Sequence, residues 1–175
     1  MLAPPLFLLA LFALGFAAWS FLEYVIHGWL AHTFATPAAP LHWTHHRDPR
    51  RVFTSLLVWG PTSVAIWGLL ATLVGATPAA ALVLGILAGF QRYEYVHWRI
   101  HFRAARGARQ ELLRVHHLAH HFRNPKAYHG VTTRLWDRLF GTLPAQHRED
   151  YARVAHHGPL GGASNFGSLR PRRMR

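Results

Sequence analysis

The chain has 175 residues, a length that suggests one domain with short appendages. It carries 19 Lys and Arg against 7 Asp and Glu, a formal net charge of +12 with His counted neutral, together with 15 histidines and no cysteine. The lack of cysteine excludes a disulfide framework, zinc ribbons, iron–sulfur clusters and cysteine nucleophiles. So basic a chain is typical of a nucleic-acid-binding protein, but the distribution of its charges argues against that function.

The first 46 residues contain one formally charged side chain, Glu23, and the stretch from Leu2 to Ile26 is apolar apart from Ser20 and Glu23. This run is long enough for one bilayer crossing, which needs about 20 residues. A cleaved signal peptide is the alternative, but no Lys or Arg precedes the run, and it is longer than the usual core of a signal peptide. We therefore expect a membrane-spanning helix at about residues 4–26.

The 40 residues from Val52 to Gln91 contain no charged side chain. They hold about two crossings of ~20 residues each, divided by a turn at Gly75–Pro78. A buried hairpin in a soluble protein is the alternative, but an uncharged run of this length is hard to place in so small a soluble domain. We expect the second and third spans at about residues 53–74 and 78–98, which makes the fold all-α and integral to the membrane.

The arginines indicate which face of the membrane is cytoplasmic. With three crossings, the end of the first span, the start of the second and the end of the third share one face. All 19 Lys and Arg lie at Arg47 or later, and those near the spans flank this face, which the positive-inside rule makes cytoplasmic. We expect a membrane domain over residues 1–157, with a cytoplasmic helical cap at 99–157, and a basic, disordered tail over 158–175.

The histidines near the predicted membrane boundaries and in the cap form four groups, all at the cytoplasmic level if there are three crossings. The groups are His27 and His32; His42, His45 and His46; His97 and His101; and His116, His117, His120 and His121. Residues i, i+3 and i+4 of a helix share one face, so the second group and the last three members of the fourth each present three imidazoles to one point. We expect His27 and His32, five residues apart, to straddle a helix end.

Imidazole is the commonest metal ligand in proteins and suits Fe, Zn, Cu and Ni. One ion takes about four to six ligands, so ten histidines from four segments would serve two ions. The alternative is that the ten rings are exposed or make ordinary hydrogen bonds. That alternative is demanding for buried rings, because each unpaired polar group costs about 1–3 kcal/mol. The pattern therefore predicts a His-rich di-metal site.

The order His-x4-His, His-x2-His-His, His-x3-His, His-x2-His-His resembles that of the integral-membrane fatty acid hydroxylase / sterol desaturase superfamily. The flanking sequences EYVIH at 23–27, LHWTHHRDP at 41–49 and YEYVH at 93–97 are similar too. The segment GVTTRLWDRLFGT at 130–142 resembles the closing motif of the fatty acid hydroxylase branch. The similarity extends over about Trp19–Thr142.

The resemblance implies a non-haem site with two Fe ions that uses O2 to oxidise an unactivated C–H bond of a lipid; Zn is compatible with purified protein because divalent affinity favours it over ferrous iron. The implied metal ligands are His27, His32, His42, His45, His46, His97, His101, His117, His120 and His121. His116 is a spare under that pattern, although its spacing from His120 leaves the register open. We expect no fused cytochrome b5 domain like that of larger relatives, and therefore an external electron donor, such as a ferredoxin, a cytochrome b5-like protein or a reductase.

Three acidic residues lie near the histidine motifs. Glu23, Glu94 and Asp137 are candidates for accepting the second N–H of a ligating histidine. Their alternatives are interfacial anchoring for the two glutamates, and helix capping or pairing with a neighbouring arginine for Asp137. The histidines outside the motifs, at positions 147, 156 and 157, are expected at the surface. His129, beside Gly130, could line the site, but a surface position is favoured.

The sequence therefore predicts an O2-dependent di-iron enzyme that hydroxylates the acyl chain of a fatty acid or lipid. Alternatives within the superfamily are a lipid or sterol desaturase and a carotenoid hydroxylase. A His-rich metal transporter is less favoured, since transporters place ligands near the bilayer midplane, where the second and third predicted spans have none. The expected partners are a lipid substrate, the membrane and an electron donor, with no nucleic acid.

Overall fold

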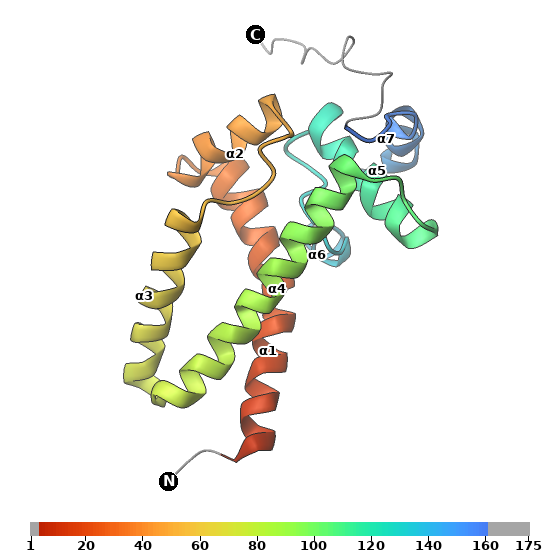
Figure 1. Cartoon of the computed structure of the whole chain (residues 1–175). Helices are drawn as coiled ribbons and strands as arrows, with labels where there is room; N and C mark the ends of the chain where they lie inside the picture. The colour runs from red at the N-terminus through yellow and green to blue at the C-terminus, as the bar shows by residue number, and fades with distance from the viewer. Residues whose placement is uncertain (1–3, 161–175) are drawn as a thin grey trace. The chain divides into compact units, whose positions relative to one another are not determined.

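The computed structural model describes residues 4–160, and within them every regular element is helical. In chain order these are α1 (Pro5–Tyr24), the π-helix η1 (Val25–Thr33), α2 (Ala38–Arg47), α3 (Leu56–Val74), α4 (Ala76–Phe102), α5 (Ala108–Phe122), α6 (Leu135–Leu139) and α7 (His147–Val154) (Figure 1). The predicted all-α fold is confirmed for this part of the chain.

The chain divides into two compact units. We name them the apolar unit, made of Met1–Glu23 and Phe53–Tyr95, and the histidine unit, made of Tyr24–Val52 and Val96–Arg175. The first contains α1 up to Glu23, α3 and most of α4, and the second contains η1, α2, the last turns of α4, and α5 to α7.

Within the apolar unit, α1 packs closely on α4 because glycines stand at the contact. A Cβ added at Gly85 would collide with the carbonyl oxygen of Phe12, and one added at Gly15 would collide with that of Leu82. Further along the same contact a Cβ added at Gly89 would collide with Trp19, whose ring meets that of Phe90 edge to face with centroids 5.1 Å apart. The two helices thus approach closely where α4 carries glycine.

Helix α3 buries no residue of its own. Its first turn is capped by Ser55, whose hydroxyl accepts a hydrogen bond from the amide of Leu57 at 3.2 Å. It ends at Val74. The next residue, Gly75, has a φ of 87°, a conformation that favours glycine. Since α4 begins directly afterwards at Ala76, Pro78 falls in the first turn of α4, where proline is tolerated, and the turn is shorter than predicted.

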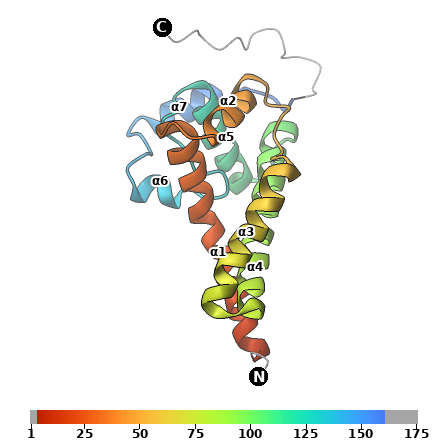
Figure 2. The same ribbon diagram turned by 90° about the vertical axis from the view of Figure 1, so that its left-hand side faces the viewer.

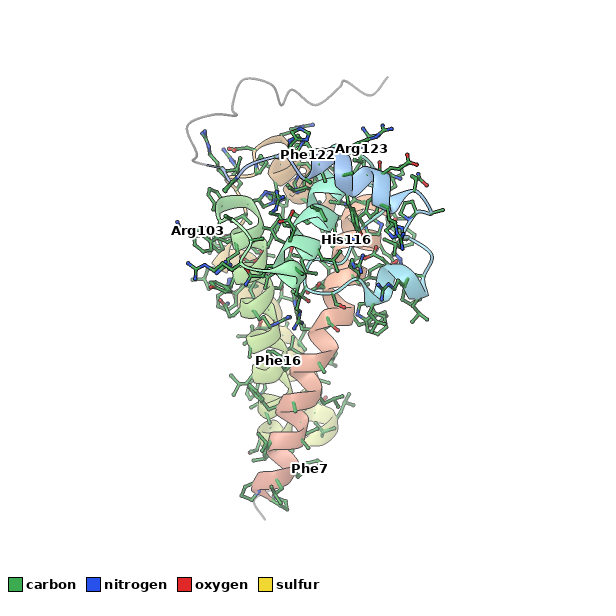
Figure 3. All side chains as sticks on the ribbon, turned by 90° about the vertical axis from the view of Figure 1, so that its right-hand side faces the viewer. Phe7, Phe16, Arg103, His116, Phe122 and Arg123 are labelled. Carbon is green, nitrogen blue, oxygen red and sulfur yellow. The ribbon has the colours of Figure 1, made fainter. Side chains whose placement is uncertain are left out.

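Two continuous helices in the described residues are long and apolar enough to cross a membrane: Pro5–Thr33 and Leu56–Val74. They correspond to the predicted spans 4–26 and 53–74, and most of their exposed side chains are apolar, as Phe7 and Phe16 of α1 illustrate (Figure 3). Helix α4 has 27 residues, and its charged residues begin at Arg92. The predicted third span, 78–98, stays a prediction.

The prediction that His27 and His32 straddle a helix end is wrong. Both lie on η1, a π-helix that continues α1. Its i→i+5 hydrogen bonding is visible at the end, where the amide of Phe34 donates to the carbonyl oxygen of Trp29 at 2.7 Å. A π-helix places residues five apart on one face, so the spacing that is irregular for an α-helix suits this element.

The core of the histidine unit lies between α5, α7 and the loop after α5, elements that gather together in Figure 2. Its buried residues are Val115, Leu118, Ala119, Ala127, Tyr128 and Val154. Arg114 of α5 fastens the end of α7 by donating hydrogen bonds to the carbonyl oxygens of Ala155 and His157 at 2.8 and 2.7 Å.

The predicted tail, 158–175, lies outside the described residues except for 158–160. In that short piece the amide of Leu160 donates to the carbonyl oxygen of His101 at 2.7 Å. The first residues of the predicted tail therefore contact the last turn of α4.

Candidate metal centre

The structure brings all ten predicted ligands together in two groups of five, both inside the histidine unit. In each group one nitrogen from every histidine lies within 4.8 Å of all the others. The first group is His27, His32, His42, His46 and His120. The second group is His45, His97, His101, His117 and His121.

The prediction that each His-x2-His-His triplet points to one place is wrong, because each triplet is divided between the two groups. Residues four apart stay together, as His42/His46 do in the first group and His117/His121 in the second. The remaining member of each triplet, His45 or His120, belongs to the other group. Residues i and i+4 of an α-helix diverge by only about 40°, whereas i+3 lies on the other side of i by about 60°.

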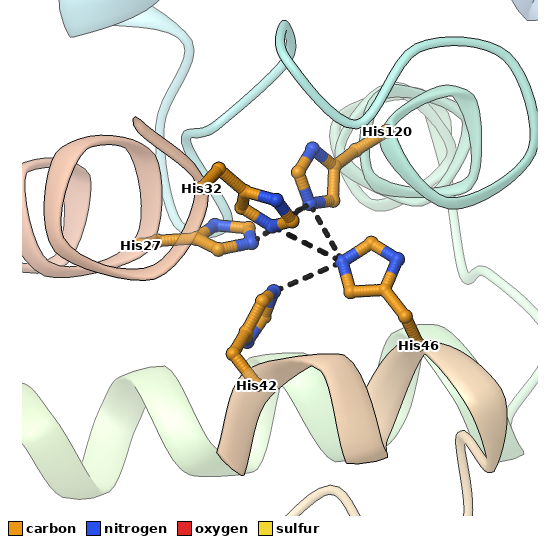
Figure 4. Close-up of side chains that lie close together, drawn as sticks. All are labelled: His27, His32, His42, His46 and His120. Atoms are coloured by element: carbon orange, nitrogen blue, oxygen red, sulfur yellow. Dashed lines mark hydrogen bonds between the residues drawn. The ribbon is translucent and has the colours of Figure 1, made fainter. Parts of the chain in front are cut away.

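Each group therefore contains two histidine pairs and one single histidine. In the first group the pairs come from η1 and α2, and the single ring comes from α5 (Figure 4). In the second group the pairs come from α4 and α5, and the single ring comes from α2. Because α2 and α5 serve both groups, the two groups share their scaffold.

In the first group the Nε2 atoms crowd around one point. His120 Nε2 lies 2.9 Å from Nε2 of His27 and 3.0 Å from those of His32 and His46. His46 Nε2 lies 3.0 Å from Nε2 of His42. A metal–imidazole bond of about 2.0–2.1 Å sets neighbouring ligand atoms of a coordination polyhedron about 3 Å apart, so these separations fit one ion.

Hydrogen bonding alone does not account for the closest of these contacts. His27 Nδ1 lies 2.6 Å from the carbonyl oxygen of His129, and His120 Nδ1 lies 2.8 Å from that of Ala127. A carbonyl oxygen only accepts, so both Nδ1 atoms carry the proton and both Nε2 atoms of the neutral rings present lone pairs. Two lone pairs 2.9 Å apart repel each other, and a cation between them turns that repulsion into coordination.

The second group shows the same crowding around His117. Its Nε2 lies 2.9 Å from that of His97 and 3.1 Å from those of His101 and His121. A single ring nitrogen carries at most one hydrogen, so it cannot make three hydrogen bonds to three other ring nitrogens. This group also fits a metal ion better than a hydrogen-bonded cluster.

Burial favours neutral rings, which are the form that binds metal. It lowers the pKa of His45 to about 4 and that of His46 to about 3, in the latter case with help from neighbouring histidines. On α5, burial lowers the pKa of His117, His120 and His121 well below the usual value, and charges on nearby rings lower it further. Neutral imidazoles keep a lone pair available at physiological pH.

Asp137 holds the loop that supports His27. Its buried carboxylate accepts hydrogen bonds from the backbone amides of His129 and Gly130 at 2.7 and 2.8 Å and from the hydroxyl of Thr142 at 2.8 Å. Gly130 permits this approach, since a Cβ there would meet the Asp137 carboxylate at 2.9 Å. The loop in turn presents the His129 carbonyl oxygen to His27.

His116 lies behind Asp137, outside both groups. Its Nε2 donates to the Asp137 carboxylate at 3.0 Å, and its Nδ1 accepts from the hydroxyl of Tyr151 at 2.6 Å. Burial lowers the pKa of His116 and keeps its ring neutral. Burial alone would raise the pKa of Asp137, but the hydrogen bonds from His116, Thr142 and Gly130 bring it below the usual value.

The two glutamates belong to the apolar unit. Glu94 accepts hydrogen bonds from the hydroxyl of Thr54 at 2.8 Å and from its backbone amide at 3.2 Å. Glu94 thereby fastens the segment that leads into α3. Glu23 is buried, at 2 % exposure.

The prediction that His129 lies at the surface is wrong. Its side chain is only 2 % exposed, and its ring lies against Tyr24, His27, His32 and His120. The ring also blocks any side chain at position 28, where an added Cβ would meet it at 2.8 Å. Of the other histidines predicted at the surface, His156 is exposed, while His147 and His157 are partly buried.

Sequence reasoning missed the carbonyl groups of Ala127 and His129, because backbone acceptors carry no residue signature. It also missed the Tyr151 hydroxyl, which lies 35 residues from His116 and outside every histidine motif. One structural mark of this loop is Tyr128, which has a φ of 61°. Such a conformation is uncommon for a bulky residue and marks a loop held by its surroundings. Here the Tyr128 hydroxyl donates to Asp150 at 2.6 Å.

Comparisons with known proteins show what the whole chain is similar to. The fatty acid hydroxylase family model matches residues 12–142. The chain is 36% identical over 143 residues to a dihydroceramide fatty acyl 2-hydroxylase of Arabidopsis thaliana, covering 75% of this chain and 60% of that protein. It is 31% identical over 159 residues to the fatty acid 2-hydroxylase of Mus musculus, covering 82% and 42%.

Among solved structures, the hydroxylase domain of scs7p matches with a TM-score of 0.70 and 28% sequence identity, covering 79% of this chain and 57% of that one. The chain thus spans six-tenths or less of the length of these relatives.

Proposed function

Because the chain belongs to the fatty acid hydroxylase family, we propose that it is a membrane-bound, O2-dependent enzyme that hydroxylates the acyl chain of a fatty acid or lipid. The relatives are named for action at position 2 of a fatty acyl chain, and one of them for dihydroceramide. Position 2 of a free or amide-linked acyl chain is therefore the first substrate position to test. The observation that carries the proposal is the 2.9 Å distance between Nε2 of His27 and Nε2 of His120, two unprotonated nitrogens that a metal ion would bring together.

We propose that the two five-histidine groups each hold one iron ion, with the ten histidines as ligands. The donor set fits, since imidazole suits Fe and the nitrogen separations match one ion per group. Iron held in this way supplies the reduction of O2 coupled to oxidation of an unactivated C–H bond.

The chain's own residues prepare the site in two ways. Burial keeps the rings neutral and keeps water away from most of the ligand atoms. The carbonyl oxygens of Ala127 and His129 fix the proton on Nδ1 of His120 and His27, which leaves each Nε2 free to bind metal. Asp137 and His116 act through the loop as positioning residues, and we keep Glu23 and Glu94 as candidates for the same role.

We propose three membrane spans, at about 4–26, 53–74 and 78–98. The cap at 99–157, the metal site and the C-terminus would all lie on the cytoplasmic face. The absence of Lys and Arg before Arg47 and their concentration at Arg92 and beyond support this orientation. An acyl chain would then approach from the bilayer, and electrons would approach from the aqueous side.

The proposed reaction requires an electron source. Inserting one oxygen atom of O2 into a C–H bond and reducing the other to water consumes two electrons and two protons. We propose that an external donor supplies the electrons, such as a ferredoxin, a cytochrome b5-like protein or a reductase. The exposed arginines of the cap, Arg103, Arg106 and Arg109 among them, are suited to an acidic carrier.

The decisive experiment is lipid mass spectrometry of cells with and without the gene, combined with metal analysis of the purified protein. We expect acyl chains that gain one oxygen atom only when the gene is present, and fragmentation that places the hydroxyl at position 2. We also expect about two iron ions per chain from iron-replete cells, with zinc an acceptable substitute in purified protein.

The same spectra separate the alternatives. Acyl chains that lose two hydrogen atoms would indicate a desaturase, and oxidised carotenoids would indicate a carotenoid hydroxylase. Either result would overturn the proposed hydroxylation while leaving the metal site intact. A chain with no bound metal after growth in iron would overturn the metal site itself.

A further inference from the structure

Helix α6 buries its acidic residue and exposes its leucines. The buried residue of this helix is its acid, Asp137, at 0% exposure. Its apolar residues face outward, with Leu135 54% exposed, Leu139 66% exposed and the adjacent Phe140 43% exposed. A helix on the surface of a soluble domain shows the opposite pattern. We call Leu135, Leu139 and Phe140 the α6 apolar face.

The orientation of α6 is fixed by the hydrogen bonds of Asp137. The carboxylate accepts from two backbone amides, from Thr142 and from His116, all inside the histidine unit. Turning the leucines inward would pull this carboxylate away from four donors, of which only the Thr142 hydroxyl has another partner, the hydroxyl of Tyr24. The exposure of the α6 apolar face is therefore built into the fold and is not the result of a loosely held helix.

The α6 apolar face adjoins one of the candidate membrane-spanning helices. The ring of Phe140 stacks on Tyr24 with centroids 5.3 Å apart and meets Trp29 edge to face at 5.6 Å. Both partners lie on Pro5–Thr33, the first candidate span, whose Ile26 and Leu30 are also exposed apolar residues. The α6 apolar face thus contacts, through Phe140, the end of a helix suited to the bilayer.

One exposed arginine, Arg138, stands next to Leu139 in the chain. Arg134, one turn earlier, is partly buried, and its guanidinium group lies over the ring of Tyr151 at 6.0 Å. Arginine beside exposed apolar residues is typical of helices that lie in the membrane interface, where the cation reaches lipid phosphate. A two-fold contact with a second copy fits less well, because it would bring each copy's arginines toward those of the other.

We propose that α6 is an interfacial anchor, with the α6 apolar face inserted among lipid acyl chains and Arg138 at the phosphate groups of an anionic bilayer. The inference rests on the proposed membrane location of the chain but not on its hydroxylase chemistry. It also gives Asp137 a second role, since the residue that orients α6 toward lipid also holds the loop that supports His27.

The test uses single-cysteine labelling, since the chain contains no cysteine. Leu139→Cys carries an environment-sensitive fluorophore in protein reconstituted into phosphatidylcholine vesicles containing phosphatidylglycerol. The matched control is Ala145→Cys, an exposed position in the same unit but beyond α6. We expect the label at 139 to be quenched by lipids brominated on their acyl chains and protected from aqueous iodide, with the control at least about threefold more sensitive to iodide.

Three results decide the matter. Equal iodide quenching at positions 139 and 145 would overturn the proposal. Protection at 139 from both iodide and brominated lipid would also overturn it, because protein and not lipid would then cover the face. Stronger quenching by brominated lipid at 139 than at 145 supports it, and Leu135→Cys repeats the measurement should the first variant fold poorly.

The contribution of charge is measured separately. Adding Arg138→Gln to Leu139→Cys should weaken quenching by brominated lipid in vesicles with phosphatidylglycerol and leave it unchanged in phosphatidylcholine alone. An unchanged signal in both would remove Arg138 from the anchor. Because metal content and lipid products are measured independently, failure of the anchor and failure of the hydroxylase proposal give different results.

Discussion

The apolar unit and the histidine unit differ in how much their helices bury and in how many of the buried residues are polar. In the apolar unit α3 buries nothing and turns Leu57, Leu69 and Leu73 outward. In the histidine unit α5 buries six consecutive residues, three of which are histidines. The difference indicates that burial of apolar side chains away from water does not organise both units. The surface of α3 in the apolar unit is suited to lipid. The histidine unit is organised around buried polar groups that need partners.

What stabilises each unit differs accordingly. The apolar unit depends on close packing between helices, where Gly15 and Gly85 let backbones approach. The histidine unit places ring lone pairs face to face, so without a cation its centre is repulsive. We therefore expect substitutions at the metal site to change metal content and activity, and substitutions in the apolar unit to change stability.

The largest expected effect comes from removing a ring at the centre of one group, His120, whose Nε2 lies within 3.0 Å of three other Nε2 atoms. His120→Ala should lower hydroxylation at least about 100-fold and reduce bound iron, while the protein still inserts into membranes. His156→Ala, at an exposed histidine outside both groups, is the matched control. Iron per chain and product per chain are measured after growth in iron. Full activity in His120→Ala would refute the metal assignment.

A smaller effect is expected from the support of His27. Asp137→Asn replaces one carboxylate oxygen with an NH2 group, which cannot accept the hydrogen bonds that the surrounding amides, hydroxyl and imidazole donate. The loop that carries the His129 carbonyl oxygen should therefore be held less firmly. We expect metal affinity to fall about 10–100-fold, as is typical when a partner of a ligating histidine is lost. Metal affinity is measured by competition with a chelator, on folded protein only.

Glu111→Gln is the control for Asp137→Asn, since it also alters a carboxylate of the histidine unit, one that pairs with Arg114 and not with the loop at 127–130. We expect it to lower stability with much less effect on metal affinity. Equal losses of affinity in both variants would mean that Asp137 contributes only general stability.

The sequence predicted the elements of the apolar unit closely because its signal is local. An uncharged run and a glycine at position 75 are enough to place α3, which ends one residue before that glycine. Hydropathy cannot place α4 as clearly, since its charged residues begin inside the helix at Arg92. Hydropathy alone therefore supports two of the three predicted spans more strongly than the third, which falls on α4.

In the histidine unit the sequence predicted which ten histidines gather but not how they divide. Helical spacing predicted that each triplet would point to one place. The directions of residues i+3 and i+4 around the helix axis differ by about 100°, so His45 and His120 each join the group that the rest of their triplet does not. The π-helix that aligns His27 with His32 is rare enough that spacing alone would not suggest it. The supporting carbonyl oxygens belong to the backbone and leave no trace in residue identity.

In the apolar unit, a single added methyl group tests whether close packing holds α1 and α4 together. Gly85→Ala should destabilise the protein by about 1–3 kcal/mol, because the new Cβ would collide with the Phe12 carbonyl and the helices would have to separate. Gly68→Ala on α3 is the matched control, since a Cβ there meets nothing within 4 Å. Thermal unfolding in detergent is the measurement, and equal midpoints for the two variants would contradict close packing.

The smallest expected effect concerns the hydrogen bond between Thr54 and Glu94. Thr54→Val removes the hydroxyl donor but keeps the shape and the backbone amide, so we expect a loss of about 1 kcal/mol in stability. Thr62→Val is the matched control, because that hydroxyl donates only within α3, to the carbonyl oxygen of Val58 at 2.7 Å. If Glu94 serves only the apolar unit, iron content stays unchanged in Thr54→Val while the unfolding temperature falls. A fall in iron content at unchanged unfolding temperature would instead assign Glu94 to the support of the metal ligands, and the separation between the two units would be less complete than their burial indicates.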